Sequence, residues 1–195
     1  MTEQMAGKCP FGFSNDGSAT DTSEPSYTHT AIAPALSRDK LPTLVSEPIA
    51  EGADGLPTGR CLCGGASYKI TKPVKRVFAN HDPASRRWTG GISLTVMVRA
   101  TSLEFHGWGR LVQHAASDDA LHCFCRTCGT SMFIRHVKPE AMDGMLSLSA
   151  GTLDTLDGFE LAAETWIDEK PSLYNFEGER RRLTGAEIAA TYGGR

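Results

Sequence analysis

From residue 59 onward, hydrophobic and polar positions alternate in short runs that are separated by glycine, proline and Asp-Gly signals. In the run 92–98, for example, Ile92, Leu94, Val96 and Val98 fall on one face. A period of two residues is typical of a strand with one buried face. We therefore predict an all-β domain built from antiparallel sheets. Its clearest candidate strands are residues 66–71, 92–98, 103–108, 120–125, 131–137, 144–150 and 159–167.

A short helix is predicted close to the C-terminus. Thr184 can serve as its N-cap, and Glu187 three residues later completes a capping box. Gly193 and Gly194 follow as a stop signal.

Residues 1–57 differ in texture from the rest, because they are rich in Ser, Thr, Pro, Asp and Gly and hold only short apolar islands. Such a segment buries too little surface to offset the entropy lost on ordering it. We predict a flexible N-terminal extension over residues 1–57 and one globular domain over residues 58–195.

Composition narrows the possible partners and the compartment. The chain of 195 residues carries a formal charge of −3, so it lacks the basic excess of a nucleic-acid-binding protein, and no nucleic-acid partner is expected. No segment has the apolar length of a signal peptide or a membrane span, which predicts a cytoplasmic protein that does not bind membranes. Cytoplasmic thiols stay reduced, so clustered cysteines indicate a metal or catalysis rather than disulfides.

Two cysteine pairs carry the strongest chemical signal. A C-x-C pair lies in "GRCLCGG" and a C-x-x-C pair in "CFCRTCGTS", and a glycine follows each pair and lets the backbone turn. The pairs can converge into a tetrahedral thiolate site of the kind that zinc prefers, although four scattered, buried thiols are the simpler alternative. Because four thiolates leave no open position, this zinc would be structural. The predicted ligands are Cys61, Cys63, Cys125 and Cys128.

Five motifs occur in the order and approximate spacing of one known family: "GRCLCGGASYKI", "RRWTGG", "FCRTCGTSMF", "SAGTLD" and "ETWIDEKPSLYNF". In these motifs the chain resembles the glutathione-dependent formaldehyde-activating (GFA/CENP-V) family over roughly residues 58–192. The resemblance implies an Mss4-like β-tent stapled by one structural zinc at the four cysteines. It also implies a second zinc, held by a C-H-C-x-x-C loop, where an adduct of formaldehyde with glutathione is formed or cleaved in a carbon–sulfur lyase reaction.

The loop of the second zinc departs from the family pattern. When the sequences are anchored on "RRWTGG", Asn80, Asp82 and Ser85 occupy the three cysteine positions, and His81 remains. Oxygen groups bind zinc more weakly than thiolates, so we expect one structural zinc and no metal at this loop. Three interpretations stay open. The first is an open zinc site with His81 and Asp82 as ligands and Asn80 and Ser85 as weak oxygen donors. The second is a metal-free site in which His81 and Asp82 act as acid and base, with Ser85 as a further candidate catalytic residue, and the third is a polar loop held by side-chain turns.

The basic-aromatic run that follows has two interpretations. Arg86 and Arg87 could bind the carboxylates of a glutathione-like ligand, with Trp88 as an apolar wall. Alternatively, the arginines face solvent and the tryptophan anchors the loop to the core.

Two function classes follow from these observations. The first is an enzyme of the family type, a carbon–sulfur lyase on small thiol–aldehyde adducts, with the activity lost or altered because the second zinc loop is substituted. The second is a non-catalytic, zinc-stabilised module that binds a small molecule or a protein. Glutathione or a related small thiol adduct is the expected ligand, and the sequence gives no indication of oligomeric state.

Overall fold

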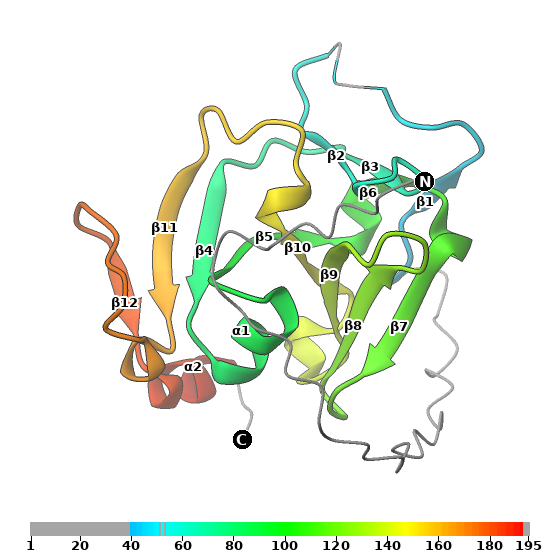
Figure 1. The fold of residues 1–195 in the computed structure, drawn as a ribbon. Coiled ribbons are helices and arrows are strands. Elements are labelled where there is room, and N and C mark those ends of the chain that lie inside the picture. The colour runs from blue at the N-terminus through cyan, green and yellow to red at the C-terminus, as the bar shows by residue number, and fades with distance from the viewer. Residues whose placement is uncertain (1–39, 51, 53, 193–195) are drawn as a thin grey trace, which may run out of the picture. The chain divides into compact units, whose positions relative to one another are not determined.

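The computed structural model describes residues 40–50, 52 and 54–192, and within them the chain forms a four-stranded and an eight-stranded sheet (Figure 1). The smaller sheet has the order β1 (Thr43–Val45), β6 (Leu103–His106), β3 (Ser67–Ile70), β2 (Thr58–Arg60). The larger sheet has the order β12 (Arg181–Leu183), β11 (Glu160–Thr165), β4 (Arg76–Asn80), β5 (Ser93–Arg99), β10 (Met145–Ser149), β9 (Ser131–His136), β8 (Ala120–Cys125), β7 (Leu111–Ala115). Two helices, α1 (Pro83–Thr89) and α2 (Gly185–Tyr192), and the 3₁₀ turns Ala100–Ser102, Trp108–Arg110, Glu140–Met142, Ala150–Thr152 and Ile167–Glu169 complete the described part.

The all-β prediction is confirmed, and each of the candidate strands corresponds to a strand of the structure. The pairing is mostly antiparallel, as expected for a β-tent. Three pairs are parallel instead: β1 with β6, β4 with β11, and β11 with β12. Long connections make all three possible, because a parallel pair cannot be joined by a tight hairpin, and even consecutive β11 and β12 are separated by residues 166–180.

The hydrophobic core joins both sheets. Tyr68 and Phe105 of the smaller sheet and Phe133, Leu146 and Leu148 of the larger one are fully buried. The rings of Phe105 and Phe133 meet edge to face, with their centroids 6.1 Å apart. Burying such aromatic side chains contributes about 1.5 to 3 kcal/mol each to folding, which explains why the alternating sequence specifies these faces.

The opposite face of the larger sheet is also covered, although its residues are polar. Ser93, Thr95, His122 and Ser147 all lie on this face and are each at most 8% exposed. The simple alternation of apolar and polar residues assigns such positions to solvent, since it assumes that one face is wet. These polar residues are nevertheless buried. They form one wall of the pocket described in the next subsection.

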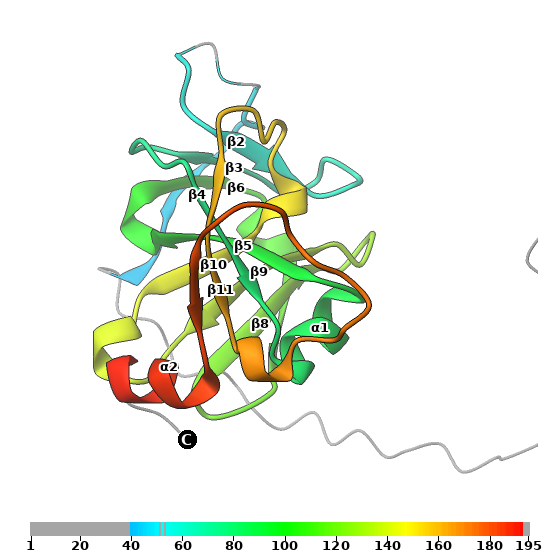
Figure 2. The ribbon, with the colours of Figure 1, turned by 90° about the vertical axis from the view of Figure 1, so that its left-hand side faces the viewer.

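Both helices lie at the end of the larger sheet where β4 finishes (Figures 1 and 2). The C-terminal helix α2 is confirmed together with its capping box, because Thr184 Oγ1 accepts from Glu187 N at 3.2 Å and the Glu187 carboxylate accepts from Thr184 N at 2.7 Å. Gly193 and Gly194 lie outside the described residues. Helix α1 occupies part of the stretch for which one reading was a polar loop.

The start of the globular domain stays a prediction, because residues 1–39 lie outside the described part. Residues 43–45 form β1 at an edge of the smaller sheet, so part of the segment assigned to the extension contributes a strand. No helix in the described residues is both long and apolar enough to span a bilayer.

Candidate metal centre and candidate active site

The four predicted cysteine ligands converge in the structure. Cys61 and Cys63 flank the turn after β2, and Cys125 and Cys128 form the turn after β8. Their sulfur atoms all lie within 4.8 Å of one another, with Cys61 to Cys63 at 3.5 Å and Cys63 to Cys125 at 3.8 Å. Four sulfurs bound tetrahedrally at about 2.3 Å from a zinc ion would be about 3.8 Å apart. The group can therefore hold a metal ion, and no other His, Cys, Asp or Glu cluster of this kind occurs in the described ranges.

Donors around Cys125 and Cys128 favour the thiolate form of these two residues, whereas at Cys63 the Gly65 backbone N–H lowers the pKa but the neighbouring sulfurs outweigh it and raise it to about 11. The Thr130 hydroxyl, 3.2 Å from the Cys128 sulfur, and the Thr130 backbone lower the pKa of Cys128 to about 5. Burial raises the pKa of Cys125, but the backbone N–H groups of Cys128 and Thr127 outweigh burial and lower it on balance. Since metal ligands must be deprotonated, the surroundings of Cys125 and Cys128 suit a bound cation.

The three residues at the expected second-zinc cysteine positions also meet, and they bind one another. The Asn80 amide donates to Ser85 Oγ at 3.1 Å, and Asn80 Oδ1 accepts from Asp82 N at 2.9 Å. Ser85 Oγ in turn donates to Asp82 Oδ2 at 3.0 Å. In this Asn80–Asp82–Ser85 cluster each residue is hydrogen-bonded to the other two, and Asp82 Oδ1 is the carboxylate oxygen that these bonds leave unused.

Helix α1 explains this arrangement. Asp82 is its N-cap, and the carboxylate also accepts from Ser85 N at 3.0 Å. Pro83 follows at the first helical position, where a missing N–H costs nothing. Gly90 ends the helix in the left-handed region at φ 72°. The side chains of Asp82 and Ser85 are held by this local geometry.

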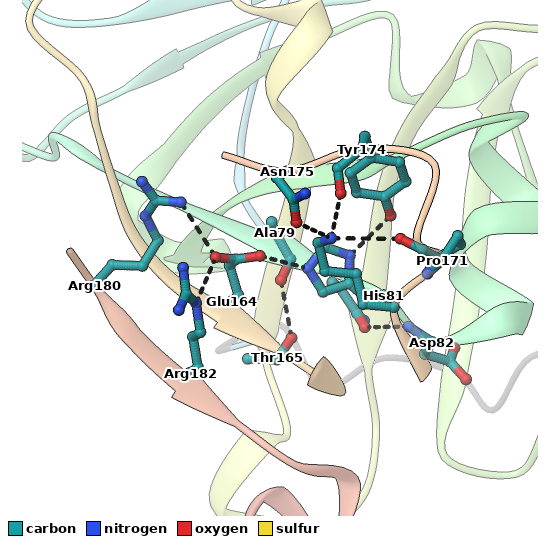
Figure 3. Close-up of polar contacts among 12 residues, drawn as sticks. Ala79, His81, Asp82, Glu164, Thr165, Pro171, Tyr174, Asn175, Arg180 and Arg182 are labelled. Carbon is teal, nitrogen blue, oxygen red and sulfur yellow. Dashed lines mark hydrogen bonds and ion pairs between the residues drawn. The ribbon is translucent and has the colours of Figure 1, made fainter. Parts of the chain in front are cut away.

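His81 is completely buried, and its ring lies between Glu164 and Tyr174 (Figure 3). Its Nε2 lies 3.0 Å from Glu164 Oε2 and its Nδ1 lies 2.9 Å from the Tyr174 hydroxyl. The neighbouring strand β11 places Glu164 there, because Glu164 pairs with Ala79 in the parallel register of β4 and β11. The structure thus separates His81 from the Asn80–Asp82–Ser85 cluster.

The charge of Glu164 is compensated on its other oxygen. Oε1 accepts from Arg180 Nη1 and from Arg182 Nε, both at 3.2 Å. Burial raises the pKa of Glu164, but His81 and the two arginines lower it on balance, so the carboxylate is ionised. Burial lowers the pKa of His81, which makes the neutral ring that donates from Nε2 to Glu164 and accepts from Tyr174 the consistent assignment.

A pocket of about 600 Å³ lies between the Asn80–Asp82–Ser85 cluster and the polar face of the larger sheet. Its floor includes Ser93, His122 and His136. His136 Nε2 lies 2.8 Å from Ser147 Oγ. Burial is the main cause that lowers the pKa of His136 to about 4, and the nearby His122 ring lowers it further. Burial likewise lowers the pKa of His122. Near neutral pH the pocket therefore presents two uncharged imidazoles.

None of the three predicted ligand-binding residues, Arg86, Arg87 and Trp88, lines this pocket. Arg86 and Arg87 line a different depression, on the far side of α1, together with Leu173 and Tyr174. Arg86 also donates from Nε to the His81 carbonyl at 3.0 Å. Trp88 packs edge to face on the His122 ring with the centroids 4.7 Å apart, so it anchors the helix to the sheet.

Sequence reasoning missed Glu164, Tyr174, His122 and His136 as neighbours of this site. All four lie more than 30 residues beyond the 80–88 stretch. Strand pairing brings Glu164, His122 and His136 near it, and Tyr174 reaches His81 from the segment between β11 and β12. His122 and His136 carry one available signal, since both sit at positions where strand alternation would direct their side chains away from the core.

Comparison with known proteins places these features in a family context. The model of the glutathione-dependent formaldehyde-activating enzyme family matches residues 56–169. A protein of Schizosaccharomyces pombe described as an uncharacterized lyase is 21% identical over 132 residues, which cover 67% of this chain and 92% of that protein. A crystal structure of a Rhodobacter sphaeroides protein matches with a TM-score of 0.41 and 20% identity, covering 50% of this chain and 87% of the other.

Proposed function

The chain belongs to the glutathione-dependent formaldehyde-activating enzyme family, and from this membership we propose that it is a zinc-stapled protein that binds a small molecule in the pocket beside α1. The family activity, a carbon–sulfur lyase reaction on small thiol–aldehyde adducts, is lost or altered in this chain. Glutathione or a related small thiol adduct is the candidate ligand, and the cytoplasm is the proposed location.

The first part of the proposal assigns zinc to Cys61, Cys63, Cys125 and Cys128. The sulfur spacing and the donors to Cys125 and Cys128 support this ion. Zinc would crosslink the turn after β2 to the turn after β8 and so join the two sheets. With four thiolate ligands it has no position left for substrate, so its role is to stabilise the fold.

The single observation that carries the second part is the hydrogen-bonded Asn80–Asp82–Ser85 cluster. A soft thiolate set has become an amide, a carboxylate and a hydroxyl, and apart from Asp82 Oδ1 these groups are hydrogen-bonded to one another and to the start of α1. Binding zinc there would break these bonds and the N-cap, and it would gain only weak oxygen ligands.

The altered chemistry follows from this donor set. In a lyase of the family type, zinc stabilises the thiolate and polarises the hydroxymethyl group, which are Lewis-acid roles. Asn80 and Ser85 carry no charge and cannot take over either role. What the described residues still offer is a pocket that can bind and orient a small polar molecule, with Asp82, His122 and His136 as groups that can hold a proton.

A non-catalytic binding module is the second candidate function. It is favoured by the hydroxyl of Ser93, which is buried at the pocket floor without a hydrogen-bond partner. A bound ligand could supply the missing hydrogen-bond partner of this hydroxyl, whether or not a reaction follows.

Two measurements test the proposal together. Metal analysis of the purified protein should give one tightly bound zinc per chain. In exchange NMR, the protein should not accelerate formation of the glutathione–formaldehyde adduct at the rate a zinc-loaded family site would give. Two zinc ions per chain together with rapid exchange would refute the loss or alteration of the activity.

A further inference from the structure

The pocket beside α1 carries an excess of negative charge. Among the described residues that line it, the carboxylates are those of Asp82, Asp119 and Glu140, and Lys138 is the cation. None of these four side chains forms an ion pair within the described part of the chain. His122 and His136 add no charge near neutral pH, because burial lowers the pKa of each. The potential in the pocket is therefore negative, which favours a cation and disfavours an anion.

Asp82 is one of the partly buried charges of the pocket, and one of its carboxylate oxygens has no hydrogen-bond partner among the described residues. Oδ2 accepts from the backbone and hydroxyl of Ser85, at 3.0 Å each. Oδ1 receives no hydrogen bond from any described residue. The carboxylate is thus fixed in position as the helix cap while one oxygen stays open to a ligand in the pocket.

Ser93 supplies a second, independent sign of a ligand. The residue is 1% exposed, and its Oγ is buried without a partner. Ser93 lies opposite Asn80 in the pairing of β4 and β5, and it lines the pocket. A buried hydroxyl without a partner is unfavourable, and a ligand that brings its own hydroxyl would satisfy it.

His122 can contribute to the same recognition. The His122 side chain is only 8% exposed, and its ring packs against Trp88. It nevertheless forms no hydrogen bond with another residue in the described ranges. A neutral imidazole offers one donor and one acceptor, so it suits the hydroxyl of a ligand.

We propose that this pocket binds a small, cationic, hydroxyl-bearing molecule, with the cationic group at Asp82 and the hydroxyl at Ser93 and His122. This inference rests on the proposed function, because it names the ligand class of the same pocket. For a thiol adduct it means an amine-bearing thiol rather than glutathione with its two carboxylates.

The position of the arginines supports the same assignment. A site for the carboxylates of glutathione needs bidentate donors, and Arg86 and Arg87 lie on the other side of α1. An anionic ligand in the pocket would meet three carboxylates and only the exposed Lys138.

Three probes of similar size separate charge from shape. We would titrate 2-(dimethylamino)ethanol as the cation, 3-methyl-1-butanol as the neutral analogue and 3-hydroxypropionate as the anion into ¹⁵N-labelled full-length protein. Binding is followed by amide shifts around Ser93 and His122. The cation should bind at least about tenfold more tightly than the anion, since it gains an attraction where the anion meets a repulsion.

Two pocket variants locate the groups responsible. Asp82→Asn keeps a good N-cap while removing the charge, and it should reduce the preference for the cation about tenfold. Ser93→Ala should weaken the hydroxyl-bearing cation several-fold and leave its preference over the anion unchanged. Asp118→Asn is the matched control. Asp118 is exposed and does not line the pocket, although its neighbours Ser117 and Asp119 do.

The outcomes distinguish the small-molecule function of the pocket from the class of its ligand. If none of the probes binds at millimolar concentration, the proposed small-molecule function of the pocket fails. If the anion binds as tightly as the cation, or if Asp82→Asn leaves the preference intact, the inferred ligand class is wrong and the pocket function stands.

Discussion

His81 Nε2 lies 3.0 Å from Glu164 Oε2, and both side chains are at most 1% exposed. Since side chains of consecutive residues point in different directions here, His81 faces β11 while Asn80 and Asp82 face the pocket. This relationship gives His81 a structural role that does not depend on a metal. It offers a physical reason why a histidine stands in a loop whose three expected cysteines are replaced.

Glu164→Gln should destabilise the protein by about 2 to 4 kcal/mol. The change keeps the shape of the side chain but leaves the Arg180 guanidinium, whose side chain is 7% exposed, without its anion. Removing one partner of a buried ion pair is costly because the other charge remains buried. Urea denaturation at neutral pH measures the effect.

Glu160→Gln is the matched control, because Glu160 lies on the same strand and is exposed. Its effect should stay within about 0.5 kcal/mol. Equal effects of the two substitutions would contradict a stabilising role for the buried network.

The sequence predicted the strands far better than the segment between β4 and β5. Alternation marks a strand because burial repeats every second residue, and this pattern is local. The hydrophobic pattern does not predict helix α1, because the helix has only seven residues and no apolar stripe. Its local signal was the pair Asp82-Pro83, an N-cap followed by proline at the first helical position, which is a recognisable helix start.

The site itself was only partly predictable. The cysteine pairs predict a metal site, because the short spacing within each turn places two ligands close together. The partners of His81 could not be read in the same way, because the register of β4 with β11 alone brings Glu164 to it across more than eighty residues. The buried polar face of the sheet was hidden for a related reason, since Ser93 and His122 occupy positions that alternation assigns to solvent.

Cys61→Ser should lower the zinc content and unfold the protein. A serine hydroxyl is a poor zinc ligand at neutral pH, and the zinc is proposed to crosslink the two sheets. Zinc stoichiometry and circular dichroism report both effects.

Cys123→Ala is the control, because Cys123 is buried outside the metal group. It should keep one zinc per chain and cost about 1 kcal/mol for the small cavity. A Cys61→Ser protein that stays folded with a full complement of zinc would contradict the assignment.

His136 should make stability fall as the pH decreases from about 6.5 to about 4. Burial lowers the pKa of His136 to about 4 in the folded protein, whereas the unfolded chain has the ordinary value of about 6.5. Between these values the unfolded state binds a proton that the folded state excludes, so acid favours unfolding. The loss amounts to about 2 to 3 kcal/mol over the whole interval.

The test compares urea denaturation at pH 7.5 and pH 4.5 for the wild type and for His136→Gln. The variant should show the smaller decrease in unfolding free energy. His114→Gln serves as the control, because His114 is exposed on the neighbouring strand β7, and it should leave the pH dependence unchanged. If the unfolding free energy decreased equally in all three proteins, His136 would not be the cause of the pH dependence.

Restoring the three cysteines should create a second zinc site. Asn80, Asp82 and Ser85 already meet through direct hydrogen bonds, so the triple variant Asn80→Cys, Asp82→Cys, Ser85→Cys would bring three thiols together at the edge of the pocket. Zinc binds such a set far more tightly than the native oxygen groups. The zinc content should rise from one to two ions per chain, and the stability of the apo form should drop by about 1 kcal/mol because the Asp82 cap is lost.

The second ion would have three thiolate ligands and a fourth position open to the pocket, which is the arrangement of a catalytic site. Formation of the glutathione–formaldehyde adduct should then accelerate in exchange NMR, unless the negative pocket excludes glutathione, in which case an amine-bearing thiol should respond first. The single variant Asp82→Cys is the control and should not add a second zinc, since one thiolate is not enough. If the triple variant still bound one zinc, the loss of the three cysteines could not be the reason for the missing second site.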